Sequence, residues 1–182
     1  MLEERRWPTI EIHTSASHRA RYTRDMSLVL AIAMFAEATF GTRVSNVGGF
    51  TLYRAPSGCF LSKVLPSGTQ AVFQIANNNR ADVKFALMNN SWASLKPGQS
   101  ITAKVSIDGF KPYDGTFTSS LLLSMPTIAT LISYDTASGI FAGKGVVVER
   151  GANALGIVPT GSTRPLAQLT ECAWGSVDPF AE

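Results

Sequence analysis

The sequence predicts a mainly β domain, sandwich-like in its layering, with one or two short helices that include a closing helix near the C-terminus. Three observations predict this class. Apolar and polar residues alternate with a period of two in several segments between residues 50 and 159, turn residues separate these segments, and only two stretches have helical spacing. The chain of 182 residues is long enough for one domain with its own core.

Three segments carry the strand pattern most clearly: ITAKVSI (101–107), DVKFALM (82–88) and QAVFQIA (70–76). In the first, every second residue is apolar and the residues between are polar. In DVKFALM, Phe85 is one of the apolar residues expected to face inward, and in QAVFQIA, Phe73 is one. Such alternation is typical of strands with one buried face.

Residues that favour turns separate the predicted strands. We expect turns at LPSGT (65–69), KPGQ (96–99) and YDGT (113–116), where proline, glycine and aspartate fit the backbone geometry of turns. GVVVER (145–150) and NALGIVP (153–159) predict a further hairpin.

Two stretches have the spacing of short helices. The first begins at Pro126 and runs to Tyr134. The second is STRPLAQLTECAW (162–174), in which a serine or threonine can cap the start, Pro165 lies in the first turn, and apolar residues recur on one face up to Cys172. We expect Cys172 to point toward the core.

The apolar run LVLAIAMF (28–35) predicts an export signal. It is too short to span a bilayer, which takes about 20 residues, but it suits the apolar region of a signal peptide. Three arginines lie upstream, between residues 19 and 24. Ala36 and Ala38 fit an A-x-A cleavage site downstream.

We therefore predict a leader at residues 1–38 and a β-rich exported domain at 39–182, with no stable transmembrane span after processing. The alternative is that the apolar run forms an amphipathic helix packed on the domain. Met1 and Met26 both stay open as the start of translation.

Charge and cysteine content bear on partners and compartment. Without residues 1–38 the chain keeps eleven Lys or Arg and eight Asp or Glu. These charges are scattered, and no run of basic residues lies among aromatic residues, so we expect no nucleic-acid partner.

Cys59 and Cys172 are the two cysteines, and in an exported protein they most simply form one disulfide. The alternative is two buried thiols in a reducing compartment.

Histidine limits the available chemistry. His13 and His18 are the two histidines, and both precede the predicted cleavage site. A processed domain without histidine has no Ser-His-Asp, Cys-His or histidine–zinc site. No S-x-x-K or G-x-S-x-G motif occurs, and SGIFAGKG (138–145) departs from the phosphate-loop pattern at both ends. We expect no cofactor, no metal and no catalytic activity.

Carboxylates are the remaining catalytic candidates, because a glycosidase-type mechanism needs two acids across a cleft. Asp108 and Asp114 lie in predicted turns, where aspartate commonly forms turn hydrogen bonds. No calcium-loop spacing occurs. The mid-chain set comprises Asp82, Asp108, Asp114, Asp135 and Glu149.

Surface contact is then the expected function. The segment FKPYDG (110–115) sets an aromatic between a Lys-Pro pair and an Asp-Gly pair, a composition suited to contact. The alternatives are that its aromatics pack over a sheet edge and that Trp92 belongs to the rim of the core. The predicted interaction surface comprises Trp92, Lys96, Phe110, Lys111 and Tyr113.

The segments SLKPGQSITAKVSIDG (94–109) and GSTRPLAQLTEC (161–172) resemble the invasion-associated locus B family of exported bacterial proteins. The shared pattern is an L-x-x-G turn, a strand ending in an aspartate-glycine turn, and a closing helix. This chain lacks that family's second cysteine pair, and Leu166 stands where its helix has alanine. The resemblance implies a small β-rich exported protein linked to host interaction, without catalytic residues.

The sequence as a whole predicts a periplasmic or secreted binding protein whose partner is an unknown protein or envelope component. An envelope hydrolase with a carboxylate pair and a purely structural envelope protein are the alternatives.

We predict that the processed protein begins at Thr39. Intact mass of protein recovered from its native host should equal that of residues 39–182. A mass that retains residues 1–38 would contradict both the export signal and the histidine-free domain.

Overall fold

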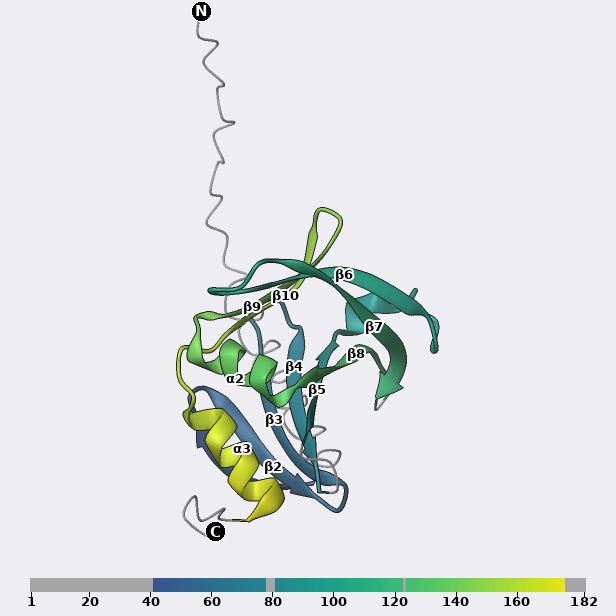
Figure 1. The fold of residues 1–182 in the computed structure, drawn as a ribbon. Helices are drawn as coiled ribbons and strands as arrows, with labels where there is room; N and C mark the ends of the chain where they lie inside the picture. The colour runs from purple at the N-terminus through teal and green to yellow at the C-terminus, as the bar shows by residue number, and fades with distance from the viewer. Residues whose placement is uncertain (1–40, 78–80, 123, 176–182) are drawn as a thin grey trace, which may run out of the picture. The chain divides into compact units, whose positions relative to one another are not determined.

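The structure is a computed structural model, and it describes residues 41–77, 81–122 and 124–175. The predicted leader, its cleavage site and both histidines lie outside these residues. The described part forms one antiparallel sheet with two α-helices and a short 3-10 turn (Figure 1).

Ten strands make up the sheet among the described residues, in the order β1-β2-β3-β4-β5-β8-β7-β6-β9-β10, and every pairing is antiparallel. The strands are β1 (Thr42–Val47), β2 (Phe50–Ala55), β3 (Gly58–Val64), β4 (Gln70–Ala76), β5 (Asp82–Met88), β6 (Ser100–Ile107), β7 (Tyr113–Leu122), β8 (Met125–Ser133), β9 (Gly145–Arg150) and β10 (Asn153–Pro159). The other elements are η1 (Asn90–Trp92), α2 (Tyr134–Ala142) and α3 (Arg164–Trp174).

The sheet curls so that its two halves form facing layers, with α2 and α3 against the inner side (Figure 1). Phe73 of β4 lies 4.9 Å from Phe85 and 4.9 Å from Phe141 of α2, measured between ring centroids. Phe85 in turn meets Phe117 of β7 at 6.4 Å. One core therefore joins both halves, and the prediction of a mainly β, sandwich-like domain with a closing helix is confirmed.

The closing helix α3 packs on β2, β3 and β4 through buried Leu166 and Leu169. Cys172, near its end, forms a disulfide with Cys59 of β3, with 6.0 Å between the Cα atoms. The predicted disulfide is thus confirmed. Arg54 of β2 adds a second link, because its guanidinium donates to the Cys172 carbonyl at 3.0 Å.

Two side chains tie β10 to the opposite half of the molecule. The Lys63 ammonium donates to the Pro159 carbonyl at 2.9 Å and lies 4.9 Å from the centroid of the Phe50 ring, and desolvation at this site lowers the pKa of Lys63. The Thr69 hydroxyl donates to the Leu155 carbonyl at 3.3 Å. Edge strand β10 is therefore held over the turn between β3 and β4.

Two local predictions are wrong. Of the helix predicted at 126–134, residues 126–133 form most of strand β8, because Pro126 stands near a hairpin end and β-branched residues follow it. The helix begins only afterwards, where the Ser133 hydroxyl accepts a hydrogen bond from the Thr136 N–H. YDGT (113–116) lies inside β7, and the turn falls at Asp108 to Pro112 instead.

The other strand predictions agree with the structure. The segments 70–76 and 82–88 match β4 and β5, and β6 covers 101–107. The hairpin of β9 and β10 forms as expected, with Arg150 opposite Asn153. No helix within the described residues has the length and apolar character needed to cross a membrane.

Replacing Cys59 and Cys172 together by serine should lower the melting temperature. The disulfide joins cysteines 113 residues apart. Closing a loop of this length stabilises the folded state by up to about 4–5 kcal/mol in the chain-entropy model. Calorimetry should show a drop of at least about 5 °C. Ala167→Ser, at an exposed position of α3, is the control and should change little. Ready labelling of both thiols in native, oxidised protein would contradict the bond.

Candidate functional site

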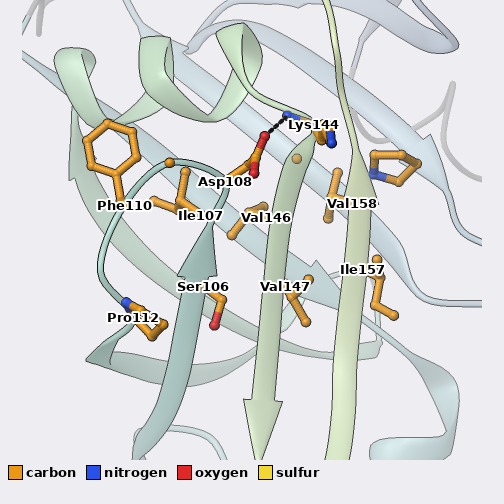
Figure 2. Close-up of a pocket in the computed structure, with 13 residues that line it drawn as sticks. Ser106, Ile107, Asp108, Phe110, Pro112, Lys144, Val146, Val147, Ile157 and Val158 are labelled. Atoms are coloured by element: carbon orange, nitrogen blue, oxygen red, sulfur yellow. Dashed lines mark hydrogen bonds between the residues drawn. The ribbon is translucent and has the colours of Figure 1, made fainter.

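A hollow lies where β6, β9 and β10 meet the loops at their ends (Figure 2). We call it the end groove. Its volume is about 530 Å³, and most of the side chains that line it are apolar. Those that define its chemistry are Ser106, Asp108, Phe110, Lys144, Val147 and Ile157.

The floor of the end groove follows from strand register. Ser106 of β6 pairs with Val147 of β9, and Val147 pairs with Ile157 of β10, so the three side chains share the outer face of the sheet. Figure 2 shows them side by side. Ile157 is 58% exposed, although the outer face of an antiparallel sheet is usually polar. An apolar surface thus remains accessible here.

Hydrogen bonds join the three loops that form the upper rim. The Asp108 carboxylate accepts from the Lys144 N–H at 3.4 Å, which links the β6–β7 turn to the start of β9. The Gly161 N–H donates to the Gly143 carbonyl at 2.9 Å, and the Thr160 hydroxyl donates to the Ile140 carbonyl at 2.6 Å. These bonds fix the chain leaving β10 against the end of α2.

Phe110 forms one wall of the end groove. Its N–H donates to the Ile107 carbonyl at 3.0 Å and closes the turn. Its ring lies over Gly139 of α2, so closely that a Cβ on residue 139 would approach the ring atoms to 2.9 Å. The side chain is still 57% exposed. Gly139 therefore lets an aromatic side chain lie flat at the groove edge.

The end groove has few polar or charged side chains. Among the lining residues that the structure describes, Asp108 is the one acid, Lys144 the one base and Ser106 the one hydroxyl. The lining pairs no nucleophile with a histidine or cysteine. Asp108 and Lys144 stand at the polar end of an otherwise apolar hollow (Figure 2).

The predicted interaction residues divide into two groups at opposite ends of β6. Phe110, Lys111 and Tyr113 lie after its end, and Phe110 belongs to the end groove. Tyr113 opens β7 and is 43% exposed, with its pKa raised by desolvation.

Trp92 and Lys96 lie before the start of β6. Its 8 residues separate the two groups by about 26 Å. Trp92 is half-buried against the core, and the Lys96 N–H donates to the Gln99 side chain at 3.1 Å. The structure therefore does not bring all five residues into one surface.

The carboxylates are also dispersed. Asp114 and Glu149 flank Lys104 on one face of the sheet, because Lys104 pairs with both. They are two strand spacings apart, about 10 Å between backbones, on a face where Asp114 and Lys104 are exposed. Asp82 opens β5 and Asp135 lies in the first turn of α2. Within the described ranges, no three or more acidic, cysteine or histidine side chains gather into a metal-binding group.

Sequence reasoning missed most of the end groove. Lys144, Val147 and Ile157 were not candidates, since each lies in an ordinary strand or turn pattern. The available signal was the run VVV at 146–148, which places an apolar residue on both faces of β9. An apolar side chain on the outer face of an antiparallel strand indicates a covered or binding surface.

Comparison with protein-family models, curated proteins and solved structures finds no match to this chain.

Gly139→Ala should displace Phe110 without loss of the fold. Alanine is more favourable than glycine in a helix by about 1 kcal/mol. This gain offsets part of the cost of moving the exposed Phe110 ring. We expect the melting temperature to change by less than about 5 °C. The Phe110 ring signals in NMR spectra should shift strongly. Ser138→Ala, the preceding helix position, should leave them in place, and unchanged signals in Gly139→Ala would contradict the contact.

Proposed function

We propose that this protein is an exported, non-enzymatic binding protein, and that the end groove receives an apolar side chain or short apolar segment of a protein partner. The observation that carries the proposal is the exposed apolar floor beneath a rim of loops joined by hydrogen bonds. A binding surface requires accessible apolar area in a fixed shape, and the end groove combines the two.

The composition of the end groove supports a protein partner. Protein interfaces place apolar contacts at the centre and polar groups at the rim. Ile157, Val147 and Phe110 supply the apolar centre, while Asp108 and Lys144 supply one charge of each sign at the edge. The volume of about 530 Å³ is sufficient for one or two large side chains.

The disulfide supports a periplasmic or secreted location. Disulfides persist in oxidising compartments and are rare in the reducing cytosol. Cys59 and Cys172 form the bond, and within the described residues no free cysteine remains. Together with the predicted leader, this favours a partner in the envelope or outside the cell.

The hydrolase alternative has weaker support. Asp114 and Glu149 share a face, but Lys104 lies between them in the strand register, and both Asp114 and Lys104 are exposed. A carboxylate-pair mechanism needs a cleft that holds the substrate between the two acids. The binding proposal requires no such cleft at these residues.

A photoreactive residue at position 157 tests the proposal. Introduced in the native host, it should give a discrete crosslinked product with one partner after illumination. The matched control is position 131, because Leu131 is 65% exposed in β8, a strand that does not line the end groove. Val147→Asp, combined with the photoreactive residue, should abolish the product.

Two results would overturn the proposal. The first is the same set of products, or none, at positions 157 and 131. The second is a measurable turnover of any substrate that a folded Asp114→Asn or Glu149→Gln variant abolishes. The latter would establish the hydrolase.

A further inference from the structure

A second apolar cluster lies on the outer face of the first half of the sheet, separate from the core. It comprises Tyr53, Val72, Ala86 and Met88, with Phe60, Leu122, Met125 and Ala129 partly buried beside them. The outer face of an antiparallel sheet is usually polar. The cluster therefore requires an explanation other than core packing.

A pocket of about 230 Å³ opens beside this cluster; we call it the outer pocket. Its apolar lining is Phe60, Val72, Ala86 and Leu122. Its polar lining is Ser57, Gln74 and Lys84. The outer pocket shares no lining residue with the end groove.

Strand register divides the outer pocket into two ends. Gln74 of β4 pairs with Lys84 of β5, so their side chains stand next to each other on the outer face. Val72 and Ala86 pair two residues further along the same strands, about 7 Å away. Phe60 pairs with Gln74 and forms a wall. One end therefore carries a cation and an amide, and the other is apolar.

We propose that the outer pocket binds a small monocarboxylate with a short apolar body. Among the described residues that line it, Lys84 is the one ionisable side chain, so the site favours a single negative charge. The Gln74 amide and the Ser57 hydroxyl add hydrogen-bond donors at the same end. Val72, Ala86, Leu122 and the Phe60 ring bury the apolar part.

The volume sets the ligand size. A pocket of about 230 Å³ holds about eight non-hydrogen atoms, at about 30 Å³ for each water-sized group. Hexanoate has this size and carries its charge at one end. The expected orientation places the carboxylate at Lys84 and the chain over Ala86 and Val72. The site is independent of the end groove and of the proposed protein partner.

Binding of hexanoate, hexanol and hexylamine to the purified full chain tests the proposal, with backbone NMR shifts locating each ligand. Hexanoate should bind and shift the signals of Val72, Lys84 and Ala86. Hexanol should bind at least about tenfold more weakly, and hexylamine should not bind. Lys84→Met should weaken hexanoate about tenfold and leave hexanol unchanged, whereas Lys84→Arg should retain hexanoate binding.

Two further variants complete the design. Ala86→Leu should abolish binding of hexanoate and hexanol by filling the apolar end. Lys104→Met is the matched control, because Lys104 is also an exposed strand lysine and lies outside the pocket. Equal binding of all three ligands, an unchanged affinity in Lys84→Met, or no shifts at Val72 and Ala86 with hexanoate would overturn the proposal. These outcomes do not bear on crosslinking at position 157.

Discussion

The packing of four phenylalanine rings at the centre of the molecule is the interaction on which the rest of the structure depends. Phe73 contacts Phe50, Phe85 and Phe141, with ring centroids 6.1, 4.9 and 4.9 Å away. Phe50 also meets Phe141 at 5.5 Å. Aromatic pairs of this kind contribute about 0.5–1.5 kcal/mol beyond the burial of their surface. Because Phe141 belongs to α2, these rings fix the helix inside the curled sheet.

The position of α2 determines the end groove. Once Phe141 and Ile140 are buried, Gly139 faces the β6–β7 turn and the end of the helix meets the loop after β10. The aromatic wall and the hydrogen-bonded rim are thus set by the same helix that completes the core. The packing that holds α2 in the core therefore also positions the candidate site.

The sequence allowed most of the fold to be predicted, and the reasons are local. Alternation, strict in β6 and looser in β4 and β5, identified these strands, and the apolar stripe of residues 162–174 identified α3, although the Thr163 side chain makes no capping hydrogen bond there. Cys172 on that stripe led correctly to the disulfide with Cys59. Pro126 led to an error, because proline suits the first turn of a helix and also the start of a strand after a hairpin turn.

The candidate sites were harder to predict, since they depend on contacts between distant segments. The end groove needs Ser106, Val147 and Ile157 in one row, and that row follows from pairing β6 with β9 across 37 intervening residues. Gly139 under Phe110 likewise joins two segments that show no common pattern. Phe110 was a candidate contact residue from the composition of its loop, and Asp108 was a candidate only as a catalytic carboxylate.

The side chains bound to β10 have a consequence for how this protein behaves at high concentration. An edge strand with unpaired carbonyls can recruit a strand from another molecule, and sheets extended in this way lead to aggregation. In β10, the carbonyls of Leu155 and Pro159 are already occupied by Thr69 and Lys63. Two of the backbone acceptors that an incoming strand would use at this edge therefore already have partners, which disfavours extension of the sheet from β10.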